Sequence, residues 1–149
     1  MGLVSQVSEV INQPRLEMKP ASEDSGSIVL LVDDELDLLD LAERVLHKAG
    51  FHVISAVSGE EALQRLAERS YDVAVLDLRM PVIGGHEIYR AIQESYPRLA
   101  RHVVFITGDS ANDPAHDWLA ATGCGILTKP FDIGQLTDMV HLALMREGA

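Results

Sequence analysis

The stretch IVLLVDD, residues 28–34, begins with five aliphatic residues and ends on the carboxylates of Asp33 and Asp34. A short continuous run of Val, Ile and Leu is typical of a strand that is buried on both faces of a parallel sheet. Three later runs also end on a polar residue: VAVLD on Asp77, VVFIT on Thr107 and ILTK on Lys129. Because the carboxyl ends of parallel strands share one edge of the sheet, we expect these side chains to converge there.

From Ile28 onward, apolar runs alternate with stretches of helical periodicity, which is the pattern of βαβ units. Strands are expected at Ile28–Val32, His52–Ala56, Val73–Leu76, Val103–Ile106 and Ile126–Thr128. A helix is expected after each strand. The first has apolar positions from Leu38 to Leu46 and stops at Gly50, and the second is opened by a Ser58–Glu61 capping box. The third is expected near Gly85–Ser95, the fourth from Asp113-Pro114 to Gly123, and the fifth is opened by Asp132 and Gln135. The sequence therefore predicts an α/β fold with a parallel sheet.

The composition excludes several classes of protein. A length of 149 residues suits one domain. The net charge of -11, with 12 Lys and Arg against 23 Asp and Glu, argues against direct binding of nucleic acid, which needs a basic face. Cys124 is the only cysteine, so the chain fits a reducing compartment such as the cytoplasm. No apolar stretch approaches the roughly 18 residues of a membrane span, so we expect no membrane insertion.

Residues 1–26 differ from the rest of the chain. Pro14, Pro20 and the small polar stretch from Ser22 to Ser27 predict a flexible N-terminal extension or linker, with the folded domain over residues 27–149. The apolar residues between Leu3 and Ile11 keep helical spacing, so an ordered helix or the end of an upstream domain is the alternative.

The acidic residues at the strand ends allow two interpretations. Asp33 and Asp34 could simply cap the helix that follows them. Asp77, however, ends another buried run and has no clear cap signal. Two like charges about 4 Å apart repel by roughly 4 kcal/mol at an effective dielectric near 20, so three gathered carboxylates need a counter-charge. Mg²⁺ can supply this counter-charge, and it commonly works beside phosphate oxygens. With the charge balanced by Mg²⁺ and Lys129, one oxygen of Asp77 could attack phosphorus.

Four motifs, in this order and at this spacing, resemble the receiver domain of bacterial two-component response regulators, of the chemotaxis-regulator type. They are LLVDDE at 30–35, DLRMP at 77–81, TG at 107–108 and KPF at 129–131, within a match over about residues 27–147. The resemblance implies a flavodoxin-like, doubly wound sheet of five parallel strands in the order 2-1-3-4-5, with five helices. It also implies a signalling protein rather than an enzyme, which assists only its own phosphorylation and the slow hydrolysis of its acyl phosphate.

The resemblance further implies a role for each site residue. Asp77 would accept a phosphoryl group from a histidine kinase or a phosphotransfer protein, and Thr107 and Lys129 would bind the phosphoryl oxygens. Asp34 would bind Mg²⁺ directly and Asp33 largely through water, while Asp77 and the backbone carbonyl of Arg79 would complete the metal site. The Lys129-Pro130 bond would be cis, a state that about 5% of X-Pro bonds adopt.

Two positions depart from the family pattern. Ile126 stands where family members often carry Tyr or Phe, which puts the usual relay from the threonine to that aromatic residue in doubt. Gly84-Gly85 replaces an Asp-Gly pair, which suggests a looser start of the third helix. As a hypothesis, Arg79 and Asp109 form an ion pair that partly covers the pocket and slows hydrolysis; two solvated charges without net effect are the alternative.

The expected output is protein contact with a downstream target that the sequence does not name, because the chain ends soon after the fifth helix. Two contexts fit this expectation: a stand-alone regulator, or a receiver from the C-terminus of a hybrid sensor kinase. A binding-only module that signals without phosphate is a different class of function, and the complete Asp, Thr and Lys set argues against it. Trp118 either packs in the core or belongs to a homodimer or target surface formed by the fourth and fifth helices with the last strand.

Overall fold

The computed structural model describes residues 26–108 and 111–146 of the chain. The strands in this part are β1 (Ile28–Val32), β2 (His52–Ala56), β3 (Val73–Asp77), β4 (Val103–Thr107) and β5 (Gly125–Thr128). The α-helices are α1 (Leu36–Lys48), α2 (Gly59–Glu68), α3 (Gly85–Ser95), α4 (His116–Thr122) and α5 (Ile133–Met145), and a short 3-10 helix, η1 (Leu99–Arg101), precedes β4. The predicted alternation of five strands and five helices is confirmed.

The strands form one parallel sheet in the order β2-β1-β3-β4-β5, which confirms the expected topology. Every residue of β3 and β4 is buried, as expected for continuous apolar runs near the middle of a doubly covered sheet. Both strands run one residue further than expected, so Asp77 and Thr107 are strand residues. Pairing continues to the carboxyl edge, where the N–H of Leu78 donates to the carbonyl of Ile106 at 2.8 Å.

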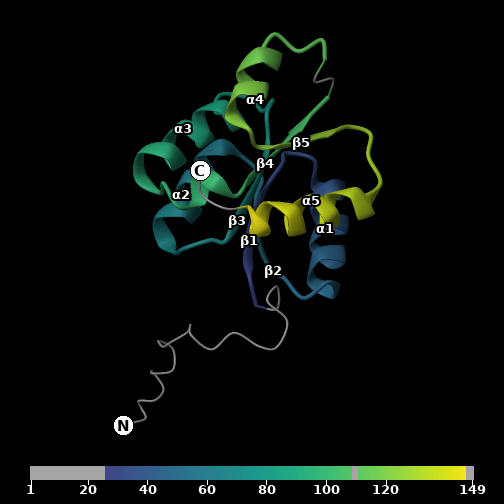
Figure 1. Ribbon diagram of the computed structural model, residues 1–149. Coiled ribbons are helices and arrows are strands. Elements are labelled where there is room, and N and C mark those ends of the chain that lie inside the picture. Colours follow the sequence, from purple (N-terminus) through teal and green to yellow (C-terminus); the bar gives the residue numbers. More distant parts are fainter. Residues whose placement is uncertain (1–25, 109–110, 147–149) are drawn as a thin grey trace.

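Helices cover both faces of the sheet (Figure 1): α1 and α5 lie on one face, and α2, α3 and α4 on the other. Because successive side chains of a strand point to opposite faces, each apolar run supplies two cores. Val75 and Ile106 pack beneath α1 and α5, whereas Leu76 and Phe105 pack beneath α2, α3 and α4. Burying each such side chain contributes about 1.5–3 kcal/mol, which holds the strand ends at a defined edge.

The starts of α2 and α5 largely follow the sequence signals. The Ser58 hydroxyl accepts the N–H of Glu61 at 3.1 Å, as predicted. The Glu61 carboxylate, however, accepts the N–H of Val57 at 2.8 Å, so the reciprocal half of the predicted capping box is wrong. Gln135 accepts the N–H of Asp132 at 2.9 Å, which confirms the expected start of α5.

The predicted start of α4 is wrong. Its N-cap is Ala115, and the helix begins at His116 rather than at Asp113-Pro114. The Asp113 carboxylate accepts the N–H of Ala115 at 2.8 Å, which makes a local side-chain turn ahead of the helix. The predicted end is confirmed, because Gly123 has a φ of +72° and terminates the helix in the left-handed conformation.

The start of α3 is tight, so the expectation of a looser start is also wrong. A Cβ atom on Gly84 would lie 2.6 Å from the carbonyl oxygen of Leu78, and one on Gly85 would lie 2.8 Å from that of Asp77. The Glu87 carboxylate accepts the N–H of Gly84 at 2.9 Å. The two glycines therefore let α3 begin directly against the end of β3, beside Asp77.

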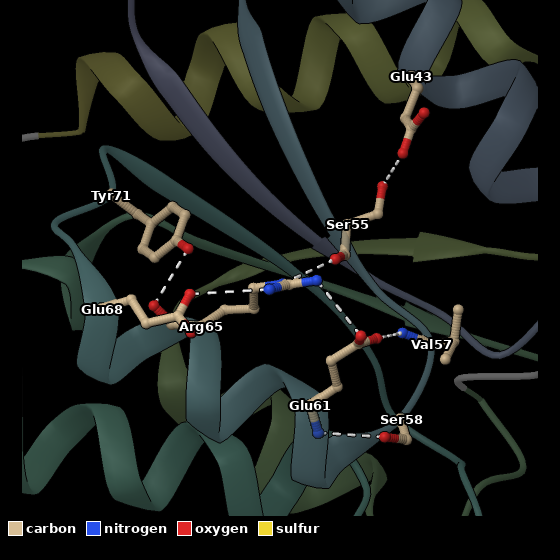
Figure 2. Close-up of polar contacts among 8 residues, drawn as sticks. All are labelled: Glu43, Ser55, Val57, Ser58, Glu61, Arg65, Glu68 and Tyr71. Carbon is tan, nitrogen blue, oxygen red and sulfur yellow. Dashed lines mark hydrogen bonds and ion pairs between the residues drawn. The ribbon is translucent and has the colours of Figure 1, made fainter.

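Polar contacts around Arg65 fasten α2 to the edge strand β2 (Figure 2). The Arg65 guanidinium donates to the carbonyl of Ser55 at 3.4 Å and lies 3.3 Å from the Glu61 carboxylate. On the other side of the strand, the Ser55 hydroxyl donates to Glu43 of α1. Satisfying a backbone group of an edge strand with a side chain limits its pairing with other chains.

Two expectations concern membranes and the N-terminus. Across the described ranges, none of the helices has the length and apolar character needed to cross a membrane. The expected flexible extension over residues 1–26 lies outside the described residues, except for Gly26.

Val82 is the one non-glycine residue with positive φ in the described part of the chain. Its φ is +68°, its side chain is 96% exposed, and the N–H of Ile83 donates to the carbonyl of Pro81 at 2.8 Å across it. A β-branched residue in this γ-turn is strained by about 1–3 kcal/mol.

We expect Val82→Gly to raise the free energy of unfolding by about 1 kcal/mol, because the relief of strain exceeds the extra entropy of glycine in the unfolded chain. Urea denaturation measures the change. Val82→Ala is the matched control: it keeps a Cβ at positive φ and should gain much less. A glycine variant less stable than wild type would contradict the strain.

Candidate functional site

The candidate site lies at the carboxyl edge of the sheet, where four of the five strands deliver a polar residue. Asp33 and Asp34 directly follow β1, Asp77 and Thr107 are the last residues of β3 and β4, and Lys129 directly follows β5. The N–H of Lys129 donates to the carbonyl of Thr107 at 2.8 Å, which ties the end of β5 to the end of β4. The predicted convergence of these strand ends is confirmed.

Three carboxylates form a cluster at this edge. Asp33, Asp34 and Asp77 each offer an oxygen, and these oxygens all lie within 4.8 Å of one another. Asp33 and Asp77 are buried, while Asp34 is exposed. Backbone amides orient the two buried groups: the N–H of Glu35 donates to Asp33 Oδ1 at 2.8 Å, and the N–H of Arg79 donates to Asp77 Oδ1 at 3.2 Å. The cluster is therefore held by the backbone that follows each strand.

Lys129 supplies the positive charge of the site. Its ammonium lies 3.2 Å from Asp33 Oδ2, 3.8 Å from Asp77 Oδ2 and 2.6 Å from Glu35 Oε1. The expectation that Lys129 lies beside Asp77 is confirmed, and the Lys129-Pro130 bond is cis, as expected. Three carboxylates, those of Asp33, Glu35 and Asp77, thus lie within 4.0 Å of one ammonium.

Burial and like charges shift the acidity of the site. The pKa of Asp77 is raised to about 7, first by burial of its carboxyl group and then by the negative charge of Asp33, although Lys129 opposes the rise. Burial also raises the pKa of Asp33, against the N–H of Glu35 and the charge of Lys129. Burial lowers the pKa of Lys129, but the hydrogen bond to Glu35 and the charges of Asp33 and Asp77 outweigh it, so the net change is upward. The carboxylates of the site outnumber its one ammonium, so ionisation of all of them would leave a net negative charge.

Thr107 adds an uncommitted hydroxyl group. Its side chain is buried, and its Oγ1 atom has no hydrogen-bond partner among the described residues. A buried hydroxyl without a partner is costly unless a polar group can approach it. A hydroxyl in this state, one strand away from Asp77, suits an anionic oxygen as its partner.

Arg79 forms an ion pair, but not one that the sequence predicted. Its Nε atom donates to Asp113 Oδ2 at 3.2 Å, and its Nη2 atom also contacts the Asp113 carboxylate. Asp109, the partner in the hypothesis from the sequence, lies outside the described residues. The hydrogen bonds of this pair raise the pKa of Arg79 and lower that of Asp113.

Sequence reasoning missed two residues, Glu35 and Asp113. Glu35 has a visible signal in the sequence, because it is the third acid in a row after β1. Lys129 is the cation expected at the same edge of the sheet, so it is the natural partner for this acid. Asp113 was expected only to open the fourth helix, and no spacing rule links it to Arg79 in a different loop. Ile126 and Trp118 are partly buried and pack against the core cluster over α3 and α4. For Trp118 this confirms the core-packing alternative.

The arrangement has the parts for phosphoryl chemistry. Oxygen donors gathered this closely suit a hard divalent cation. A carboxylate beside an ammonium and a free hydroxyl can act as a nucleophile while both donors hold the transferred group.

The comparisons agree with this chemistry. The response regulator receiver domain family matches residues 29–141. Transcriptional regulatory protein PrrA of Mycobacterium leprae is 36% identical over 128 residues, which are 84% of this chain and 53% of PrrA. Chemotaxis response regulator CheY4 of Vibrio cholerae has a TM-score of 0.71 at 28% identity, covering 80% of this chain and 100% of CheY4. Response regulator protein TrrA of Thermotoga maritima, solved in complex with Mg(2+)-BeF, has a TM-score of 0.68 at 27% identity, covering 79% and 99%.

The chain spans about half the length of PrrA and of the PrrA proteins of two other mycobacteria that it matches. The family match, by contrast, covers nearly the whole fold. It includes all five strands, except for the first residue of β1, together with α1 to α4 and most of α5. The chain therefore belongs to the response regulator receiver domain family.

Proposed function

We propose that Asp77 accepts a phosphoryl group from a phosphohistidine of a histidine kinase or a phosphotransfer protein. The observation that carries this proposal is the position of its carboxylate. The group is buried at the end of β3, 3.8 Å from the Lys129 ammonium, and shares a 4.8 Å cluster with Asp33 and Asp34. Phosphoryl transfer needs little covalent chemistry from the protein beyond such positioning and charge stabilisation.

In the transfer, a carboxylate oxygen of Asp77 would attack phosphorus. The P–N bond to the histidine would break, its electron pair would return to the imidazole nitrogen, and an acyl phosphate would form on Asp77. Lys129 Nζ and Thr107 Oγ1 would donate hydrogen bonds to the phosphoryl oxygens, and the N–H of Arg79 orients the carboxylate through Oδ1. The chain is then a signalling module that assists its own phosphorylation and the slow hydrolysis of the acyl phosphate, not an enzyme with a separate substrate.

Mg²⁺ is the cation that we propose for the carboxylate cluster. The excess of four carboxylates over one ammonium and the all-oxygen donor set fit this ion. Asp34 would bind it directly and Asp33 largely through water, with Asp77 and the backbone carbonyl of Arg79 completing the site. When bound, Mg²⁺ supplies positive charge against the phosphoryl oxygens. The Mg(2+)-BeF complex of TrrA supports this choice.

The wider setting is also a proposal. We infer a domain over residues 27–149 that acts in the cytoplasm, where the free Cys124 would stay reduced. Its output would be contact with a downstream protein, with α4, β5 and α5 as the face for a homodimer or a target. Its net charge of -11 argues against a direct role in nucleic-acid binding. A stand-alone regulator and a receiver from a hybrid sensor kinase both fit.

Acetyl phosphate with Mg²⁺ should label the wild-type protein with one phosphoryl group, detected by intact-mass spectrometry. Asp77→Asn should abolish the label, and Asp34→Asn should slow labelling by at least about tenfold, since it removes a metal ligand. Asp40→Asn, on an exposed turn of α1, is the control and should label normally. Undiminished labelling of the Asp77 variant would place the nucleophile elsewhere, and an unlabelled wild type would favour the binding-only alternative.

The charge cluster predicts how metal-free stability depends on pH. The pKa of Asp77 is raised from 3.8 in the unfolded chain to about 7, so its protonated form is favoured in the fold. This contribution to stability is complete below about pH 4 and is lost as the pH rises through about 7. The raised pKa of Asp33 acts in the same direction, while the shifts of Lys129 and Asp113 act outside this window.

Metal-free protein should therefore be less stable at pH 8 than at pH 5. Asp77→Asn should remove most of this difference and raise the free energy of unfolding at pH 8 by about 1–3 kcal/mol, since each pKa unit corresponds to about 1.4 kcal/mol. Mg²⁺ should restore stability to the wild type more than to the variant. Denaturant titrations in EDTA measure the free energy of unfolding, with Asp37→Asn as an exposed control. Equal stability of the wild type at pH 5 and pH 8 would contradict the proposed destabilisation by ionised Asp77.

A further inference from the structure

One ion pair joins the loop after the phosphoacceptor to the segment before α4. Arg79 lies two residues beyond Asp77, and Asp113 lies three residues before the first residue of α4. The guanidinium meets the Asp113 carboxylate with two nitrogens, Nε at 3.2 Å from Oδ2 and Nη2 against Oδ1. This two-pronged geometry is the stronger form of an arginine–carboxylate contact. Among residues 26–108 and 111–146, Asp113 is the hydrogen-bond partner of this guanidinium.

The Asp113 end of the pair fixes the start of α4. The same Oδ1 atom that meets Arg79 accepts the N–H of Ala115 at 2.8 Å, and the Asp113 carbonyl accepts the N–H of His116 at 2.9 Å. The Asp113 side chain is 9% exposed, although its contact with Arg79 lies at the surface of the protein. Because Asp113 makes all of these contacts, its position and that of the first turn of α4 change together.

The Arg79 end of the pair is fastened to the phosphoacceptor. The backbone N–H of Arg79 donates to Asp77 Oδ1 at 3.2 Å, whereas its side chain is 60% exposed. The guanidinium can therefore move while its backbone stays with Asp77. The nearby Glu87 carboxylate is engaged by the N–H of Gly84, which leaves Asp113 as the acid that holds Arg79.

We propose that Asp113 and the phosphoryl group on Asp77 compete for the Arg79 guanidinium, so that phosphorylation releases the start of α4. This inference rests on the proposed function. A phosphoryl group brings about two negative charges and three acceptor oxygens, whereas Asp113 offers one charge. The planar guanidinium can bind two oxygens of a carboxylate or two oxygens of a phosphoryl group, so a larger charge appearing beside its own backbone attracts it away from the carboxylate. The signal then passes from Asp77 to α4 through one side chain.

Trp118 provides the readout for this competition. It is the only tryptophan of the chain and lies in the first turn of α4, two residues after His116. Its ring lies 4.1 Å from that of His86, 5.4 Å from that of Phe105 and 5.8 Å from that of Tyr89, measured between centroids. A shift of the start of α4 changes these ring contacts and hence the fluorescence of Trp118.

The experiment measures the affinity for beryllofluoride with Mg²⁺ through Trp118 fluorescence, and records amide spectra of residues 115–122 without it. Asp113→Asn keeps a side-chain oxygen for the N–H of Ala115 but loses the charge that holds Arg79. We expect this variant to bind beryllofluoride about three- to tenfold more tightly, because the guanidinium is already free. Its spectrum without ligand should move toward that of the ligand-bound wild type. Asp117→Asn removes the same charge four residues away and should change neither result.

A double-mutant cycle separates competition from simple charge removal. In an Arg79→Gln background, Asp113→Asn should no longer tighten binding; a gain that persists there would be through-space electrostatics and would overturn the proposal. If the wild type binds beryllofluoride and Asp77→Asn does not, unchanged or weaker binding by Asp113→Asn would overturn this inference and leave the proposed function standing. A wild type that ignores beryllofluoride would instead remove the proposed function and, with it, this inference.

Discussion

The site depends on one constraint: the buried carboxylates of Asp33 and Asp77 share a 4.8 Å cluster, and the ammonium of Lys129, which Glu35 also binds, is the cation beside them. Burial and mutual repulsion both oppose ionisation, which is why the pKa of Asp77 is raised to about 7. Such an arrangement persists only if the rest of the fold holds it. The fully buried strands β3 and β4, with cores on both faces, supply that support. A bound cation would reduce the electrostatic repulsion between the carboxylates.

Much of this could be predicted from the sequence, because burial leaves a direct trace in residue type. A strand covered on both faces, such as Val73–Asp77, is apolar along nearly its whole length, so a single acid at its end stands out. Parallel pairing then forces such end residues to one edge, which is why the sequence alone predicts that Asp33, Asp34, Asp77, Thr107 and Lys129 lie together. The spacing of the motifs added the order of the strands through the family resemblance.

The rest could not be predicted, because side-chain contacts between loops follow no period. Asp113 was expected on its local signal to open the fourth helix, yet its carboxylate accepts hydrogen bonds from Arg79 and from the N–H of Ala115 ahead of α4. Gly84 and Gly85 were expected to loosen the start of α3, whereas the close approach of two backbone carbonyls makes that start tight. Val82 carries a positive φ that its residue type argues against. These features lie in the loops beside Asp77, where local preference and the demands of a reactive site differ.

The central claim is that the acids at the ends of β1 and β3 form one cation site beside Lys129. Paramagnetic relaxation by Mn²⁺, used in place of Mg²⁺ on ¹⁵N-labelled protein, tests it most directly. The loss of amide signal should centre on Asp33 to Glu35 and on Asp77 to Arg79, and Asp34→Asn should weaken this loss. Broadening centred on another acidic stretch, such as Glu60 and Glu61 of α2, would contradict the account.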